Sequence, residues 1–198
     1  MTPQTFIFIG RSGCGKGTQG KLLEEYLAAA DPSRKIRYEE TGFKFRKLIT
    51  GATLTSKLSK EIYDRSGIFP AFLAVWTWVT DFVEDLTGEE HIIFDGSPRL
   101  FLEAQVLESA LLFYKMKPFV IYLDIHNDVS HTRLTARGRL DDVTPERIQN
   151  RLDWYEKEVV PTIEYYKQNP HFKFLHINGD QTISEVYKEI IDRIAPLM

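Results

Sequence analysis

The sequence predicts an α/β fold in which helices cover both faces of a parallel five-stranded sheet. Short apolar runs without polar alternation are typical of strands that are buried on both faces. Such strands are expected over residues 5–9, 36–38, 91–94, 119–123 and 172–177. Helical patterns separate these runs, and strands that alternate with helices are joined by right-handed crossovers. The sheet is therefore expected to be parallel.

The helices follow from apolar residues at helical spacing. They are expected over residues 16–30, 71–86, 104–114, 144–166 and 182–194. Thr144 before Pro145 is typical of an N-cap followed by proline at the first helical position. In the second of these helices we expect Trp76, Trp78 and Phe82 to lie in the core.

Residues 41–70 also have a helical pattern, but they lie between the second strand and the next long helix. This stretch is too long for a simple connection in a compact domain. The sequence therefore predicts a small helical insertion within a single domain of residues 1–198.

Composition excludes several classes of protein. The chain has 25 Lys+Arg and 28 Asp+Glu among 198 residues, and a net charge of −3 argues against a general binder of nucleic acid or anionic membranes. Cys14 is the one cysteine, which excludes an internal disulfide and a cysteine-rich zinc site. No apolar run is long enough to span a bilayer, and no secretory signal is visible. A protein of the reducing cytosol is expected.

The most specific motif is the glycine-rich segment 10–18, which follows the first strand and precedes the first helix. Glycines let backbone N–H groups surround phosphate oxygens, and the helix N-terminus adds positive partial charge. Lys16 is expected to reach the β- and γ-phosphates of a nucleotide. The expected ATP-binding residues of this loop are Gly13, Cys14, Gly15, Lys16, Gly17 and Thr18. The fold class is thus a P-loop NTPase-type three-layer sandwich.

Gly17 stands where the general motif has Ser or Thr as a magnesium ligand. A directly metal-bound hydroxyl is therefore not expected, and Thr18 is expected to contact phosphate instead. Asp95 ends the strand 91–94, and a carboxylate there can orient Mg²⁺ through the water shell of the ion.

Arginines concentrate near the C-terminal third of the chain. Five of the twelve arginines fall within nineteen residues: Arg133, Arg137, Arg139, Arg147 and Arg151. A planar guanidinium can bind phosphate through two hydrogen bonds. A solvated helix face balanced by nearby acidic residues is the alternative, and beside the phosphate loop we favour the phosphate-binding interpretation.

Gly15-Lys16-Gly17-Thr18-Gln19 resembles the phosphate loop of adenylate kinases and related nucleoside monophosphate kinases. Other segments resemble further motifs of that family in the same order, so that the resemblance spans residues 6–179. These segments are Thr41-Gly42-Phe43-Lys44-Phe45-Arg46, Asp95-Gly96-Ser97-Pro98-Arg99, and Arg137-Gly138-Arg139-Leu140-Asp141-Asp142 followed by Arg151-Leu152.

The resemblance implies reversible phosphoryl transfer from ATP·Mg to AMP, which gives two ADP and serves adenine nucleotide homeostasis. It also implies a monophosphate-binding insertion at residues 41–70 and a lid at residues 136–146 that is very short in this chain. The lack of further cysteines excludes a zinc-stapled lid. We expect a cytoplasmic monomer that binds neither nucleic acid nor membranes.

The resemblance also implies roles for single residues. Catalytic roles fall to Lys16, Arg99, Arg137, Arg139 and Arg151, and ATP binding extends to Arg133 and Arg137. The residues expected to bind the monophosphate are Thr41, Arg46, Gly96, Arg99, Glu103, Arg139 and Arg151. Arg147 matches no motif position and is expected to be structural.

The acceptor stays open at this stage, because Glu103 stands where adenylate kinases usually carry Gln. AMP is favoured, while GMP and UMP or CMP remain alternatives. A kinase for a neutral hydroxyl would need a base that the insertion does not supply. A nucleotide-binding module without turnover is a further alternative, which the intact set of Lys16 and arginines disfavours.

Overall fold

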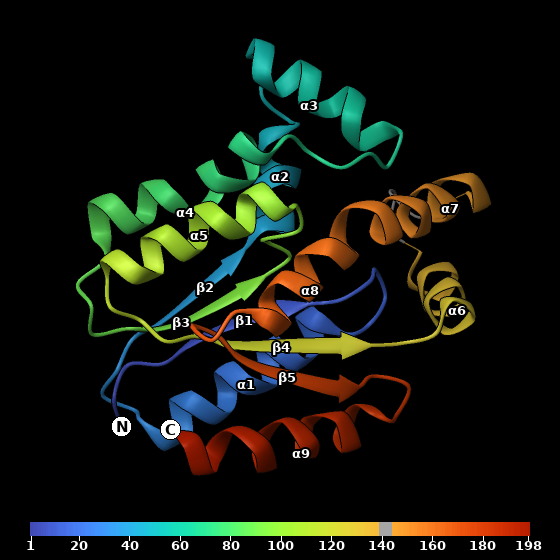
Figure 1. The fold of residues 1–198 in the computed structure, drawn as a ribbon. Coiled ribbons are helices and arrows are strands. Elements are labelled where there is room, and N and C mark those ends of the chain that lie inside the picture. The colour runs from blue at the N-terminus through green and yellow to red at the C-terminus, as the bar shows by residue number, and fades with distance from the viewer. Residues whose placement is uncertain (139–143) are drawn as a thin grey trace.

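In the computed structural model, residues 1–138 and 144–198 are described, and they form a five-stranded parallel sheet (Figure 1). The strand order is β2-β3-β1-β4-β5. The strands are Thr5–Ile9 (β1), Ile36–Glu40 (β2), His91–Asp95 (β3), Phe119–Asp124 (β4) and Lys173–Asn178 (β5). All pairs are parallel, with β1 between β3 and β4. The predicted sheet is confirmed.

Helices cover both faces of this sheet. The α-helices of the described residues are Lys16–Ala30 (α1), Thr41–Leu48 (α2), Leu54–Asp64 (α3), Ala71–Asp85 (α4), Phe101–Phe113 (α5), Asn127–Arg137 (α6), Pro145–Trp154 (α7), Val160–Gln168 (α8) and Ile183–Ile194 (α9). A 3₁₀ turn, Ala195–Leu197, follows α9. Figure 1 shows α4, α5 and α8 on one face of the sheet and α1 and α9 on the other. Among the described residues, no helix is long and apolar enough to cross a bilayer.

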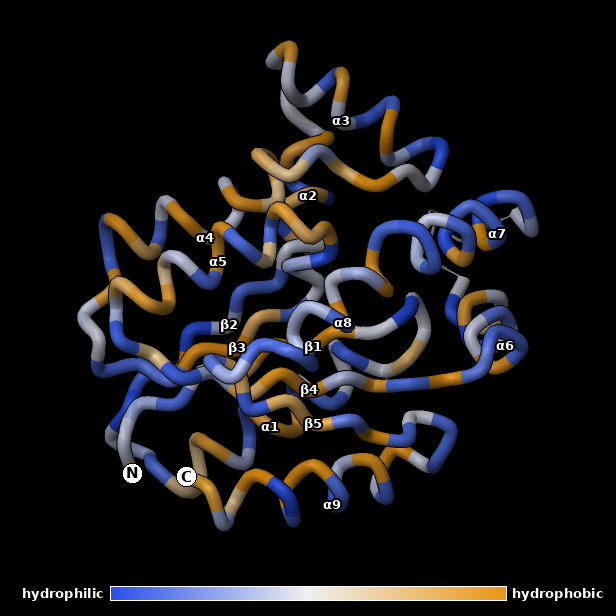
Figure 2. Tube along the Cα trace, viewed as in Figure 1, coloured by the Kyte–Doolittle hydropathy of each residue, from blue (hydrophilic) through white to orange (hydrophobic). Residues whose placement is uncertain are grey.

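The core has two layers because strand side chains alternate between the faces of the sheet. In β1, Phe6 and Phe8 belong to the cluster shared with α1 and α9, while Ile7 and Ile9 pack with α4, α5 and α8. All four side chains are at most 2% exposed. Figure 2 shows apolar and polar residues alternating along α9, and those facing the sheet are buried.

Two of the three aromatic residues predicted for the core of α4 are there. Trp78 and Phe82 are each 2% exposed, but Trp76 is 45% exposed, so its prediction is wrong. Neighbouring residues on an α-helix are separated by about 100°, which puts residues two apart on nearly opposite faces. Trp76 and Trp78 therefore cannot both face the sheet.

The helix predicted over residues 144–166 is interrupted. Thr144 does cap α7, because its side chain accepts a hydrogen bond from the Arg147 N–H at 3.3 Å. A π-helical turn, Tyr155–Val159, then separates α7 from α8. Pro161 follows this turn and lacks the N–H of a regular helical hydrogen bond, which is a usual cause of helix irregularity.

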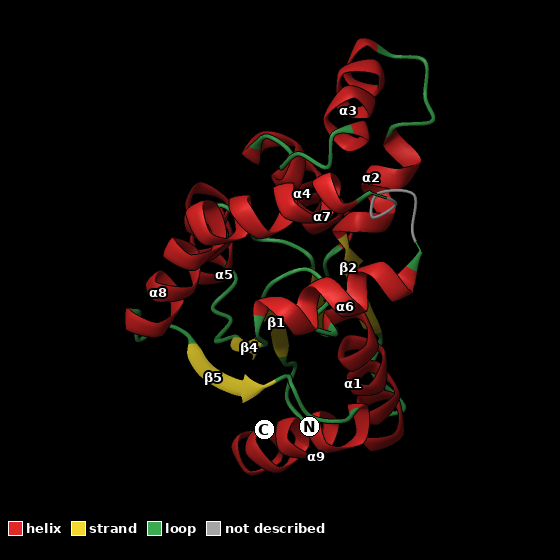
Figure 3. Cartoon of the chain, turned by 90° about the vertical axis from the view of Figure 1, so that its right-hand side faces the viewer, coloured by secondary structure: helices red, strands yellow, loops and turns green. Residues whose placement is uncertain are grey.

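The stretch from 41 to 64 folds into α2 and α3, which protrude beyond the sheet (Figures 1 and 3). Phe45 on α2 stacks on Phe69, with ring centroids 3.9 Å apart, and both rings are buried with Leu73 of α4. Lys44 Nζ donates to the carboxylates of Glu39 and Asp81, each at 2.7 Å. These contacts fasten α2 to α4.

His91 gives the fold a pH-dependent component. It is fully buried in β3, and its Nδ1 accepts a hydrogen bond from the Gln4 N–H at 3.1 Å. Burial lowers the pKa of His91 below 6.5; the Arg34 charge acts in the same direction and Asp31 opposes it. The folded chain therefore keeps His91 neutral at pH values at which the unfolded chain binds a proton.

Stability from His91 is thus present above the unfolded pKa and is lost as the pH falls below it. His91→Asn places an amide oxygen near the Nδ1 position without a titrating ring. We expect the free energy of unfolding of the wild type to fall more than that of His91→Asn between about pH 7 and about pH 5. Urea unfolding at both pH values measures this. Equal losses in the two proteins would show that His91 does not titrate differently in the folded state.

Candidate functional site

A cleft of about 660 Å³ lies at the carboxyl ends of the strands, where open α/β sheets bind ligands. The phosphate loop, the α2–α3 segment and α7 contribute to its walls. Figure 3, which views the molecule from this end, shows α7 above α6 and α3 above both. The cationic residues predicted for the site that line the cleft are Lys16, Arg46, Arg99, Arg133, Arg137 and Arg151.

Positive backbone φ angles at Gly10 and Gly15 allow the phosphate loop to turn toward the cleft. Gly15, with φ of 102°, is the N-cap of α1, so the free N–H groups of the helix point toward the cleft. Gly10 has φ of 147°, and a Cβ there would lie 2.4 Å from the Leu123 carbonyl oxygen. Lys16 Nζ donates to the carbonyl oxygens of Gly10 and Arg11 at 2.7 and 3.0 Å.

Asp95 and Gly17 decide how a magnesium ion would fit. A Cβ on Gly17 would lie 3.2 Å from Asp95 Oδ2, so a Ser or Thr there would crowd the carboxylate. Burial raises the pKa of Asp95, while Lys16 and Arg99 oppose that shift. Mg²⁺ dehydrates reluctantly, and this arrangement fits a hydrated ion oriented by Asp95 better than direct ligation by a hydroxyl at position 17.

Tyr38 supports Asp95 from the adjacent strand. Its hydroxyl donates to Asp95 Oδ2 at 3.3 Å, and Lys21 Nζ lies 3.9 Å from the centre of its ring. Gly20 of α1 makes room for this ring, because a Cβ at Gly20 would lie 2.3 Å from the Tyr38 hydroxyl oxygen.

Gly20→Ala is therefore expected to destabilise the protein. Alanine in place of a helical glycine ordinarily gains about 0.5–1 kcal/mol, but overpacking costs about 1–3 kcal/mol. Displacement of Tyr38 would also break its contact with Asp95. Urea unfolding measures the net loss, and in a Tyr38→Ala background Gly20→Ala should cost less. The same loss in both backgrounds would show that Tyr38 is not the obstacle.

Arg99 is held by several contacts at the base of the cleft. Its Nε donates to the Gly96 carbonyl oxygen at 2.7 Å, and its guanidinium carbon lies 5.4 Å from the centre of a Trp154 ring. Trp154 Nε1 in turn donates to the Ser66 carbonyl oxygen at 3.2 Å, which joins α7 to the segment that follows α3. The guanidinium is thus positioned before any ligand arrives.

Glu103 is buried and is not among the residues that line the cleft. Its carboxylate accepts from the Arg99 N–H at 2.7 Å and from Ser97 Oγ at 3.3 Å, and the residue is 2% exposed and does not line the cleft. Burial raises the pKa of Glu103, and these hydrogen bonds oppose the rise. Glu103 thus holds the 96–99 turn in this structure, because the Arg99 N–H and the Ser97 hydroxyl satisfy its carboxylate inside the protein.

The other residues predicted for the site are divided between the wall of the cleft and the protein interior. Cys14 and Thr41 are buried and do not line the cleft, whereas Gly13, Gly17, Thr18 and Gly96 do. Arg139 and much of the predicted lid lie outside the described residues.

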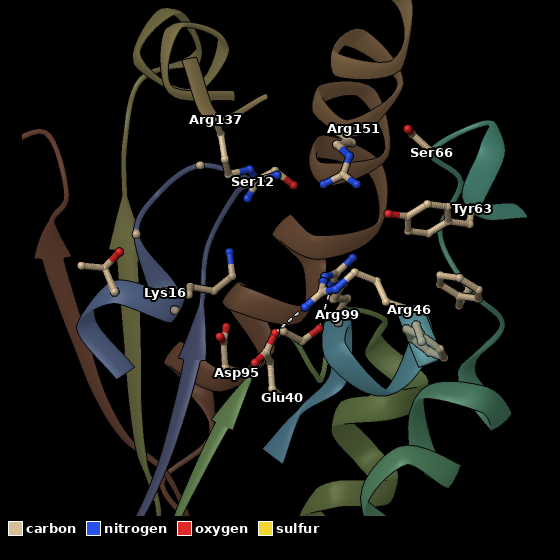
Figure 4. A pocket seen from close by; sticks show the side chains of 18 of the residues that line it. Ser12, Lys16, Glu40, Arg46, Tyr63, Ser66, Asp95, Arg99, Arg137 and Arg151 are labelled. Atoms are coloured by element: carbon tan, nitrogen blue, oxygen red, sulfur yellow. Dashed lines mark hydrogen bonds and ion pairs between the residues drawn. The ribbon is translucent and has the colours of Figure 1, made fainter. Parts of the chain in front are cut away.

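Several residues that line the cleft were not predicted from the sequence, among them Tyr38, Glu40, Tyr63 and Trp154. Tyr38 and Glu40 could have been found, because Tyr38 ends the predicted strand 36–38 and Glu40 follows closely, at an end of the sheet where ligands bind. Tyr63 and Trp154 lie on helices, where no spacing distinguishes them from ordinary surface aromatics. Figure 4 shows Arg46, Arg99, Arg151 and Tyr63 gathered around the same part of the cleft.

A phosphate loop that opens into an arginine-lined cleft, beneath a helical segment inserted after the second strand, is the arrangement of P-loop kinases. Comparison with known proteins narrows this class. The adenylate kinase family model matches residues 8–171, and the chain belongs to the adenylate kinase family.

Curated relatives agree over nearly the whole chain. Adenylate kinase 1 of Nostoc sp. is 35% identical over 185 residues, which cover 93% of this chain and 95% of that protein. Adenylate kinase of Mycolicibacterium smegmatis is 34% identical, with 95% and 97% covered. Adenylate kinase of Flavobacterium psychrophilum is 30% identical, with 95% and 96% covered.

Proposed function

We propose that this chain transfers the terminal phosphoryl group of ATP reversibly to AMP, which gives two ADP and balances the adenine nucleotide pool. Membership of the adenylate kinase family supports the reaction. The observation that carries the residue assignments is the convergence of Lys16, Arg99 and Arg151 on one cleft, from three segments far apart in the sequence.

On the donor side, the N-terminus of α1 and the amides of the phosphate loop bind the triphosphate. Lys16 leaves its carbonyl partners and donates to the β- and γ-phosphates. Arg133 and Arg137 of α6 line the same side of the cleft and neutralise the phosphate chain. Arg139 is assigned to catalysis and to the monophosphate on sequence grounds.

On the acceptor side, Arg46 of α2 and Arg99 bind the phosphate of the monophosphate, and Arg151 of α7 lies opposite them. An acceptor phosphate is already a nucleophile at neutral pH, so the chain needs no general base. Catalysis is positioning and stabilisation of charge on the shared oxygens.

A magnesium ion bound with ATP would neutralise negative charge on the phosphate oxygens. Asp95 would hold it through water, as the space around Gly17 favours. Tyr38 keeps the Asp95 carboxylate oriented for that purpose.

The acceptor base would lie against the aromatic part of the cleft. Tyr63 and Phe69 offer aromatic surface in the α2–α3 wall of the cleft, which suits a purine. Glu103 stays assigned to the acceptor on sequence grounds, although it is buried and does not line the cleft. AMP remains favoured, with GMP and UMP or CMP as alternatives.

A cytoplasmic monomer is proposed on sequence grounds.

One experiment tests the function. The purified protein is offered MgATP with AMP, GMP, CMP, UMP or dAMP, and ADP formation is measured. We expect the highest kcat/KM with AMP. A preference for another monophosphate would reassign the acceptor. ATP binding without turnover of any monophosphate would favour the non-catalytic module.

A further inference from the structure

We propose that Glu40 sets the affinity for the acceptor by occupying the guanidinium of Arg46 that the phosphate of AMP must use. This inference rests on the proposed function, since it assigns Arg46 to the acceptor phosphate. Glu40 is thus an affinity-determining residue of the cleft, and the sequence motifs give it no role.

The contact is direct. Arg46 Nη2 lies 2.7 Å from Glu40 Oε1, and both side chains line the cleft. Glu40 is the last residue of β2, and α2, which carries Arg46, begins at the next residue. Figure 4 shows the Glu40 carboxylate directed toward Arg46 within the cleft. A phosphate that binds Arg46 from the cleft therefore meets the carboxylate already there.

The charge of Glu40 also faces the ligand site. Glu40 is in register with Asp95 on the adjacent strand, so two carboxylates stand at neighbouring strand ends. Burial is the largest cause of the raised pKa of Asp95, and the negative charge of Glu40 raises that pKa as well. The negative charge of Glu40 therefore repels an incoming phosphate dianion. The ion pair with Glu40 also occupies one N–H donor of Arg46 that the phosphate would use.

Glu39, the residue before Glu40, points in the opposite direction and does not face the ligand. Glu39 is 3% exposed and pairs with Lys44, away from the cleft. Side chains alternate along a strand, so Glu39 serves the anchoring of α2 and Glu40 faces the ligand.

The ion pair is weak enough to be displaced. Each side chain is 37% exposed, and ion pairs with such access to water are readily opened. A phosphate forms a charge-assisted, two-pronged contact with a guanidinium and can replace the carboxylate. The competition then appears as a higher KM for AMP, with little effect on the chemical step.

The test is Glu40→Gln, which keeps the shape of the side chain and removes its charge. We expect the KM for AMP to fall about two- to tenfold, while kcat and the KM for ATP stay within about twofold. Glu40→Ser is expected to shift the KM in the same direction if Gln is poorly tolerated. The matched control is Asp64→Asn on α3, which breaks a surface pair with Lys60 and should leave all three constants unchanged.

An unchanged KM for AMP in both Glu40 variants would overturn the inference. A raised KM would also overturn it, because it would mean that Glu40 orients Arg46 for the phosphate. Calorimetric titration with AMP and with inorganic phosphate, without ATP, gives a readout apart from turnover. If the wild type formed no ADP, the proposed function would fail, yet tighter phosphate binding by Glu40→Gln would still support the competition.

Discussion

Lys16→Met is expected to lower kcat for ADP formation about 10²–10³-fold, the usual cost of removing one preorganised donor from a charge-stabilising site. The side chain starts from the N-terminal turn of α1, and its amine lies within 3.0 Å of two loop carbonyl oxygens at the edge of the cleft. Methionine keeps the length of the side chain but supplies no positive charge. Initial rates at saturating MgATP and AMP measure the loss.

The matched control is Lys188→Met on α9, where Lys188 pairs with Asp192 on the surface. It removes one lysine without touching the cleft and should retain the wild-type kcat. If Lys16→Met retained the wild-type kcat as well, the assignment of the donor phosphates to this loop would be wrong.

Arg99→Lys should lower kcat/KM for AMP roughly 10- to 100-fold, although it conserves the positive charge. A lysine is a point charge and cannot keep the Nε–Gly96 contact while offering a fork to phosphate. It also loses the flat contact with Trp154. Hydrogen bonds between charged partners are worth about 1.5–3 kcal/mol, which sets the expected range. Rates measured with varied AMP give the value.

Arg147→Lys on α7 is the control for the same exchange. Arg147 does not line the cleft, so its kcat/KM should match the wild type. A loss in Arg99→Lys no larger than in this control would show that the fork geometry of Arg99 is not used.

Much of the architecture could be predicted from the sequence, because burial leaves a periodic record. Strands such as Thr5–Ile9, buried on both faces, are continuously apolar, and that pattern predicted the parallel sheet. The phosphate loop was found because its geometry depends on glycines and one lysine that are adjacent in the chain. The arginines could be assigned to a common site because their motifs occur in the order of a known family.

Tertiary structure decided which way individual side chains face. Glu103 satisfies its carboxylate on the 96–99 turn, which no spacing revealed, and Trp76 lies outside the core that the helical pattern suggested. Tyr38 covers Gly20 because β2 lies beside α1, and Glu40 stands next to Asp95 because β2 pairs with β3. Periodicity records whether a segment is buried, whereas the environment of one side chain depends on segments distant in sequence that folding brings into contact.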